Sequence, residues 1–487
     1  MRTTRRLLEA EARSSVAEPS PRDTDTARRT RRPIAARVPA LLALVTSLAT
    51  VAGMTTSCSS SDDDAREPLP GDADGGADSA PEAEREDVID AGIADVVVVD
   101  SAPLRIECKE PPCAIALSTT TTTFSSPATN DEGYCALLDD GTVACWGANA
   151  DGQLGNPEAI GASPVPMRVS GLSKVTALDH TCAVDSDGSV FCWGRGPFLQ
   201  SEASVQTVET SPVRLPLPGP ATKVAFNTFS NSYGVGCAIL RDGSVVCWGS
   251  NAYWQLGEGV SQSVRNAQPL AIERAFGAKD IAVGNATFAI DGDGAMKSWG
   301  SAIGIGRPIA LDYSGWPTNV ALDHVSMLDT IGGEACAVAN GIGWCWGPND
   351  ERKAAFGTTY ARALPSAVDT PEPITRIATS RTVRGSVDSV LYFHRRRWCA
   401  TSVTGAVYCW GLNNAGQAGD GTKEFALEPV QVAGLPAPAA EVKVMPYSTC
   451  AILTNGKVYC WGSNFYGQLG AGLPRGSVLQ PVEVKLP

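Results

Sequence analysis

The sequence is poor in histidine and in net positive charge. Only three histidines occur among 487 residues, so histidine-centred acid–base catalysis and histidine-rich zinc sites are not expected. The 39 basic residues are outnumbered by 52 acidic ones, for a net charge of −13, which argues against nucleic-acid binding because phosphate contacts need a basic field. The motifs G-x-S-x-G and H-E-x-x-H and the phosphate-binding loop are also absent. We therefore predict no catalytic residues, no cofactor and no metal site.

Cysteine, glycine and proline are abundant instead. The 49 glycines and 33 prolines suit a β protein with many turns. The 15 cysteines are too many for an ordinary cytosolic chain of this size, and they favour an oxidising compartment.

The first 57 residues have the pattern of an export leader. Residues 1–37 contain ten arginines and no lysine, and an apolar run follows at 38–54. This run has about the length of a signal segment and is short for a membrane span. Together with Cys58 it resembles a bacterial lipoprotein precursor, which implies a lipid on Cys58 and an outer-membrane or cell-surface location. The alternative is a plain secretory signal with an incidental cysteine.

An acidic segment follows the leader. Residues 59–110 hold 16 acidic and 4 basic side chains, a net of −12, so most of the excess negative charge lies here. Such a stretch cannot bury enough apolar surface to offset the entropy lost on ordering. We predict that residues 58–115 are a disordered spacer and that residues 116–487 form the folded domain.

One phrase recurs seven times from residue 134 onward. The first copy reads CALLDDGTVACWGANADGQLG at 135–155, and the last reads CAILTNGKVYCWGSNFYGQLG at 450–470. The tryptophan of each Trp-Gly pair recurs at intervals of 47, 55, 51, 47, 64 and 51 residues. Repeats of this length are typical of solenoids and propellers.

Each copy has the pattern of a β-hairpin. Six copies fit a three-residue loop with glycine in the left-handed position, and the fifth, one residue shorter, fits a two-residue Asn340-Gly341 loop. Both loops place the two cysteines of a copy directly opposite each other, close enough for a disulfide. Zinc is the alternative, but its ligands usually come as close C-x-x-C pairs. The predicted pairs are Cys135–Cys145, Cys182–Cys192, Cys237–Cys247, Cys336–Cys345, Cys399–Cys409 and Cys450–Cys460.

The remaining cysteines agree with this pairing. The fourth copy has Phe288 and Ser298 at the two cysteine positions, so both members of the pair are lost together. Cys108 and Cys113 form a plausible seventh pair, and Cys58 is then left for lipid.

The repeated phrase resembles the repeat of the regulator of chromosome condensation family, in the cysteine-paired form of exported bacterial members. The resemblance covers about residues 130–487 and implies an all-β, seven-bladed propeller of four-stranded blades. Short segments that open on proline precede most later copies, and one more, PVEVKLP, ends the chain at 481–487. We therefore expect the C-terminal strand to complete the first blade and close the ring.

The resemblance favours binding over catalysis. Nuclear members of the family act as guanine nucleotide exchange factors, a role not expected for an exported protein, whereas a secreted bacterial relative inhibits β-lactamases with one propeller face. We predict a monomeric, non-enzymatic scaffold or inhibitor that binds a protein and is held at the bacterial cell envelope only by its lipid. The alternatives are a carbohydrate-binding lectin and a propeller-based lyase or hydrolase.

Specificity is expected where the copies differ. Phe198 lies in the long segment before the third copy, and two aromatic pairs occupy variable turn positions. An arginine run precedes the sixth copy, although the domain that carries it (111–487) is acidic overall, with 25 basic and 31 acidic residues. Arginine and tryptophan are frequent binding hot spots. The alternatives are aromatics that cover a blade edge and a solvated arginine run. The predicted contacts are Phe198, Tyr253, Trp254, Arg395, Arg396, Arg397, Trp398, Phe465 and Tyr466.

Overall fold

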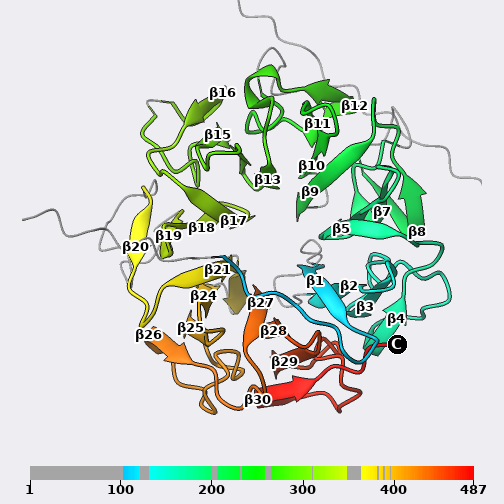
Figure 1. Ribbon diagram of the computed structural model, residues 1–487, viewed down its shortest axis with the longest axis vertical. Helices are drawn as coiled ribbons and strands as arrows, with labels where there is room; N and C mark the ends of the chain where they lie inside the picture. The colour runs from blue at the N-terminus through cyan, green and yellow to red at the C-terminus, as the bar shows by residue number, and fades with distance from the viewer. Residues whose placement is uncertain are drawn as a thin grey trace, which may run out of the picture. The chain divides into compact units, whose positions relative to one another are not determined.

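The computed structural model describes residues 102–120, 131–199, 206–230, 233–257, 265–309, 311–347, 364–380, 383–387, 390–394 and 396–487. These residues form seven four-stranded antiparallel sheets arranged as blades around a common centre (Figure 1). The predicted all-β, seven-bladed propeller is confirmed. The leader, Cys58, most of the acidic segment and Arg395 lie outside the described residues.

Each blade is built from consecutive strands that run from the channel to the rim. Blade one consists of β1 (Ala114–Thr119), β2 (Gly133–Leu138), β3 (Val143–Gly147) and β4 (Ser163–Arg168), and blade two of β5 (Val175–Asp179), β6 (Cys182–Asp185), β7 (Val190–Gly196) and β8 (Thr207–Arg214). Blade three consists of β9 (Ala221–Ser230), β10 (Tyr233–Leu240), β11 (Val245–Ser250) and β12 (Arg265–Ala271), and blade four of β13 (Asp280–Val283), β14 (Ala286–Ile290), β15 (Met296–Ser301) and β16 (Tyr313–Asn319).

Blades five to seven follow the same order, with one insertion. Blade five consists of β17 (Val325–Ile331), β18 (Glu334–Ala339), β19 (Ile342–Trp346) and β20 (Ser366–Val368). Blade six consists of β21 (Ile374–Thr379), β24 (Arg397–Ser402), β25 (Val407–Gly411) and β26 (Ala426–Gln431), and blade seven of β27 (Ala439–Val444), β28 (Ser448–Leu453), β29 (Val458–Ser463) and β30 (Ser477–Glu483). A separate hairpin of β22 (Val383–Val387) and β23 (Val390–His394) is inserted into blade six. The short 3-10 turn at Glu273–Ala275 is the one helical element that the structure describes, and none of these residues forms a helix able to span a membrane.

The predicted hairpin register is confirmed. Cys135 lies directly opposite Cys145, and the backbone N–H of Leu138 donates to the carbonyl of Thr142 across a loop with Gly141 at φ +75°. In blade five the pairing of Ala339 with Ile342 gives the expected two-residue loop. All six blade disulfides are present, with Cα–Cα distances of 4.0 or 4.1 Å, as is the Cys108–Cys113 bridge. Seven disulfides are typical of an oxidising, extracellular environment.

The expected closure by the C-terminal strand is wrong. β30 pairs with β29 and so completes blade seven, whereas blade one has its own fourth strand, β4, paired with β3. Most of the segments that open on proline are the outer strands of the preceding blades. The innermost strand of blade one is β1, which lies just before the threonine-rich stretch. Each blade is therefore continuous in sequence.

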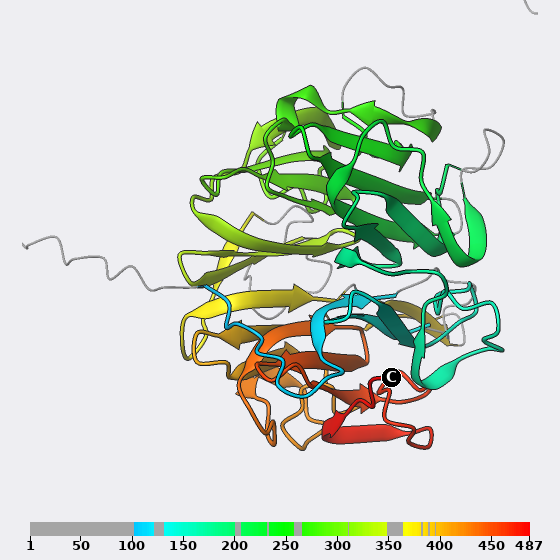
Figure 2. The same ribbon diagram turned by 45° about the vertical axis from the view of Figure 1, so that its right-hand side comes forward.

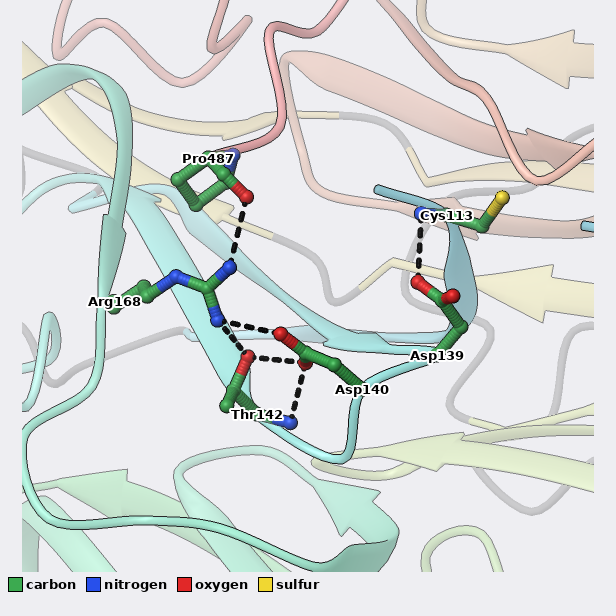
Figure 3. Close-up of polar contacts among 6 residues, drawn as sticks. All are labelled: Cys113, Asp139, Asp140, Thr142, Arg168 and Pro487. Carbon is green, nitrogen blue, oxygen red and sulfur yellow. Dashed lines mark hydrogen bonds and ion pairs between the residues drawn. The ribbon is translucent and has the colours of Figure 1, made fainter. Parts of the chain in front are cut away.

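The ring closes through an N-terminal strap, residues 102–113, which crosses blade seven in both views (Figures 1 and 2). The N–H of Glu107 donates to the carbonyl of Thr454 at 2.7 Å. At the end of the strap, the N–H of Cys113 donates to Oδ1 of Asp139 in blade one at 2.9 Å (Figure 3). Ordered contacts thus begin before residue 116, the boundary expected from composition, because the buried Cys113 ties this part of the acidic segment to the propeller.

Candidate functional site: the loop face and the central channel

The propeller has two faces of different character. Because neighbouring strands in a blade are antiparallel, the connections from first to second and from third to fourth strand emerge on one side. We call this side the loop face; it includes segments 148–162, 302–312 and 464–476 and the inserted β22–β23 hairpin. The opposite side, the hairpin face, carries the short second-to-third-strand turns and the links between blades. Variable segments are therefore concentrated on the loop face.

Four similar turns leave the third strands of blades one, three, six and seven. In blade three the side-chain oxygen of Asn251 accepts the N–H of Leu256 at 2.9 Å, and that of Gln255 accepts the N–H of Tyr253 at 2.8 Å. The same pair of contacts recurs at Asn149 and Gln153, Asn413 and Gln417, and Asn464 and Gln468. These buried amides fix the turn and leave its variable residues at the tip.

Each of these turns also packs on the next blade. A Cβ at Gly467 would lie 2.4 Å from Cα of Pro164 in the outer strand of blade one, so only glycine fits there. The equivalent residue in blade three is Trp254, which adopts φ +64° and stacks on Tyr313 of blade four at 5.2 Å between ring centroids. Trp254 is half-buried in this seam, and its position agrees with the alternative that aromatics cover a blade edge.

The repeated tryptophans hold adjacent blades together. The indole N–H of Trp146 donates to the carbonyl of Gln468 at 2.9 Å, and that of Trp299 donates to Gln255 at 2.8 Å. Trp193, Trp248, Trp346 and Trp461 likewise donate to a carbonyl of the preceding blade. These side chains are buried, as expected of structural repeat residues.

Exposed apolar side chains gather on the loop face. Among the described residues of its third-to-fourth-strand connections, seven large apolar side chains are exposed: Ile160, Tyr253, Ile303, Leu311, Leu364, Phe465 and Leu473. Among the described connections of the hairpin face, only Phe276 is a large exposed apolar residue. Phe465 is 55% exposed, lies edge-to-face with the half-buried Tyr466, and has the Arg475 guanidinium 5.3 Å from its ring centroid. Exposed apolar clusters rimmed by polar groups are typical of protein interaction sites.

The prediction that Phe198, Arg397 and Trp398 contact a partner is wrong. Phe198 and Arg397 are each 1% exposed, and Trp398 is 8% exposed and stacks on Trp410. Arg396 is nearly buried as well, and its Nε lies 3.0 Å from the carboxylate of Glu334 in blade five. Two of the three arginines are thus internal, a placement that the sequence run alone does not reveal.

Arg397 joins blade six to blade seven. Its guanidinium donates to the carbonyls of Met445 and Ser448 at 2.8 Å and to that of Gln417 at 2.6 Å. Burial lowers the pKa of Arg397 to about 10, with Tyr134 and Glu132 opposing the shift, so the side chain stays charged near neutral pH.

Glu132 makes the corresponding contact between blades seven and one. Its carboxylate accepts the N–H of Tyr447 at 2.7 Å and the hydroxyl of Ser448 at 2.6 Å. Burial raises the pKa of Glu132, although these hydrogen bonds and the charge of Arg397 oppose the shift. Glu132 and Arg397 therefore act as parts of the ring and not as surface binding groups.

The turn acids on the hairpin face have structural roles too. Asp140 accepts a hydrogen bond from the N–H of Thr142 at 2.9 Å and forms an ion pair with Arg168 at 2.9 Å (Figure 3). Burial opposes the shift, but these contacts hold the pKa of Asp140 below its usual value. Arg168 also donates to the carbonyl of Pro487 at 3.0 Å and so ties the last residue to blade one. Asp140 is engaged as turn geometry predicts.

The central channel is lined by charged side chains that sequence analysis missed. Four carboxylates and three cations line a cavity of about 210 Å³: Asp179, Asp280, Asp329, Glu441, Lys223, Arg376 and Lys443. Asp179 accepts the N–H of Phe226 in the next blade at 2.8 Å, and Asp329 accepts that of Thr379 in the next blade at 2.8 Å. Burial raises the pKa of both acids. No motif marks these residues, because they lie on innermost strands that the repeated phrase does not include.

Lysines balance the remaining channel acids. Lys443 lies 3.6 Å from Glu441 and 4.0 Å from Asp329, and Lys223 forms an ion pair with Asp280. Burial alone would lower the pKa of Lys443, but the surrounding carboxylates raise it. The acids thus serve as bridges between strands and blades, although their convergence is the feature that an enzyme would also need.

Family models identify the repeat. Models of the regulator of chromosome condensation (RCC1) repeat match residues 178–200 and 446–468, and 140–185 and 404–452. The matched segments lie in blades one, two, six and seven, and they are similar to RCC1 repeats. Six blades carry a disulfide across the hairpin, as expected from the resemblance to the cysteine-paired form of this repeat.

Curated relatives include larger proteins. The chain is 28% identical over 260 residues to the E3 ubiquitin-protein ligase HERC2 of Mus musculus and of Homo sapiens, a match that spans 50% of this chain and only 5% of those proteins. It is 26% identical over 356 residues to the ultraviolet-B receptor UVR8 of Arabidopsis thaliana, covering 69% of this chain and 76% of the receptor.

Solved structures share the fold. Human WBSCR16 superposes with a TM-score of 0.56 at 19% identity, covering 71% of this chain and 95% of that one. Yeast RCC1 (Prp20), solved bound to Kap60, superposes with a TM-score of 0.55 at 18% identity, covering 71% and 84%. At this identity the likeness concerns the fold alone.

Proposed function

We propose that this RCC1-type propeller is a non-enzymatic binding protein whose loop face contacts a partner protein outside the cytoplasm. The exposed apolar side chains of the third-to-fourth-strand connections carry the proposal, because interface cores are enriched in such residues. Tyr253 and Phe465 are the best anchors: they are 41% and 55% exposed and stand on turns fixed by buried amides. Yeast Prp20, which shares this fold, was solved with a protein partner, which is consistent with such a role.

The chemistry of the channel supports binding over catalysis. Each channel carboxylate already accepts a backbone N–H or lies against a lysine. Seven disulfides argue for an oxidising compartment, where a cytosolic GTPase would not be met, so nucleotide exchange is not proposed.

Partner capture tests the loop face. Wild type, the double variant Tyr253→Ser/Phe465→Ser and the hairpin-face control Phe276→Ser are each used to capture proteins from an envelope extract. Loss of a true anchor pair costs about 2 kcal/mol or more, roughly 30-fold in affinity. We expect the double variant to lose the partner and the control to keep it. Equal capture by all three proteins would refute the site, and glycan binding without any protein partner would favour a lectin.

We further propose that the protein is exported and carries lipid on Cys58, which would hold the propeller at the membrane through the acidic spacer. Metabolic labelling with a fatty acid should tag the wild type and leave Cys58→Ala unlabelled. Label that persists in Cys58→Ala would exclude lipidation at this residue and favour the secreted form.

A further inference from the structure

Among the residues that the structure describes, Arg376 is the channel cation without a hydrogen-bond or ion-pair partner. It lies on β21, the innermost strand of blade six, and lines the central cavity. It pairs in register with Thr401, whereas Ala378 pairs with Cys399. Arg376 therefore stands two residues from the level of the disulfides, toward the hairpin face, which is opposite to the proposed partner surface.

The other charged groups in the cavity are satisfied. Lys223 is paired with Asp280, and Lys443 is placed between Glu441 and Asp329. No hydrogen bond or ion pair joins Arg376 to the rest of the described chain, and its Nε is buried without an acceptor. An unpaired buried donor on a charged group is costly, so its retention calls for an explanation.

Arg376 also lies close to a second cation of the channel, Lys443. Its charge partly opposes the rise in the pKa of Lys443 that the carboxylates cause, so the two cations share one part of the channel wall. A guanidinium presents a planar fork of donors that matches the two oxygens of a carboxylate. The channel wall thus presents a guanidinium without a protein partner to the cavity.

We propose that the central channel binds a small carboxylate anion on Arg376, entered from the hairpin face. The cavity of about 210 Å³ has room for a ligand of a few heavy atoms. Four carboxylates against three cations line the same cavity, so a singly charged anion is favoured over a doubly charged one such as hydrogen phosphate. This site is independent of the loop face.

Acetate is the probe that tests the site. The full chain with its disulfides intact is titrated with ¹³C-labelled acetate at constant ionic strength in chloride, and binding is followed by the acetate line width. Arg376→Gln removes the charge, Arg376→Lys keeps the charge without the fork, and Arg214→Gln changes an exposed arginine at the end of β8 as a control. Circular dichroism checks that each variant is folded.

We expect saturable acetate binding that is weakened at least about tenfold in Arg376→Gln, less in Arg376→Lys, and not at all in Arg214→Gln. Should Arg376→Gln fail to fold, a loss of affinity in folded Arg376→Lys supports the fork and unchanged affinity refutes it. Non-saturable binding to wild type, or equal affinity in Arg376→Gln, would overturn the proposal. Tighter binding of phosphate than of acetate would overturn the carboxylate assignment. Capture of the loop-face partner should be unchanged in Arg376→Gln, so the two proposals fail separately.

Discussion

Replacement of Arg397 by methionine should destabilise the propeller severely. The guanidinium is 1% exposed and donates to three backbone carbonyls, those of Met445, Ser448 and Gln417. Methionine has a similar length and fills much of the same volume, so the substitution removes the hydrogen bonds with little loss of packing. The three carbonyls then lose their charged donor in a buried site between blades six and seven.

The expected cost is about 3–5 kcal/mol. Hydrogen bonds to a charged group contribute about 1.5–3 kcal/mol each, but their sum overestimates the loss because water can reach part of the site. Loss of one partner from a buried charge cluster typically costs about 3–5 kcal/mol. The charge of Arg397 also lowers the pKa of the buried Glu132, so its removal leaves that carboxyl less stable when ionised.

Guanidinium denaturation followed by tryptophan fluorescence measures this effect. Arg214→Met is the matched control, because Arg214 is exposed at the end of β8 and should change stability by no more than about 0.5 kcal/mol. A loss below about 1 kcal/mol in Arg397→Met would refute the structural role. A variant with normal stability but lost partner binding would instead restore Arg397 as a binding residue.

Three further predictions concern the ring. Burial raises the pKa of Glu132, so above pH 4.5 the folded protein binds more protons at this carboxyl than the unfolded chain does, and the contribution of Glu132 to stability falls as pH rises. The stability of wild type relative to Glu132→Gln should therefore increase as pH is lowered from 7 toward 4.5. A flat or opposite trend in the denaturation midpoints would contradict this. Removal of the Cys135–Cys145 bridge by double alanine substitution should cost about 2–3 kcal/mol, and non-reducing peptide mapping should find no bridge between different blades. Blade four, with Phe288 and Ser298 in place of the cysteines, should exchange its amide hydrogens fastest, and slower exchange there than in the bridged blades would refute the stabilising role of the disulfides.

The repeated phrase made the hairpins and their disulfides predictable. The turn glycines fix the loop length, and loop length fixes which residues face each other, so the pairing of Cys336 with Cys345 followed even from a copy with one residue deleted. The buried tryptophans could be recognised as structural because they recur in every copy.

The innermost strands were not predictable from that phrase. Segments such as β1 and β21 have little in common beyond small and β-branched residues, so the proline-opened outer strands were assigned to the wrong blades. The channel charges stand on these innermost strands and were missed for the same reason. Register with the cysteine-bearing strand, once known, places them directly.

Burial of the arginine run was equally hidden. A run of charged residues usually lies on a solvated surface, and the sequence carries no sign that blade seven presents two carbonyls to Arg397 and the turn at Gln417 a third. The acceptors lie 20 to 51 residues away in the chain, so only the assembled ring brings them together.

Hydrogen–deuterium exchange of the propeller with and without its captured partner is the most direct test of the proposed binding face. We predict that protection on binding falls on the loop face, at the turns 251–257 and 464–470 that carry Tyr253 and Phe465. The hairpin-face turns at 139–142 and 454–457 should exchange unchanged. Protection confined to the hairpin-face turns would contradict the account.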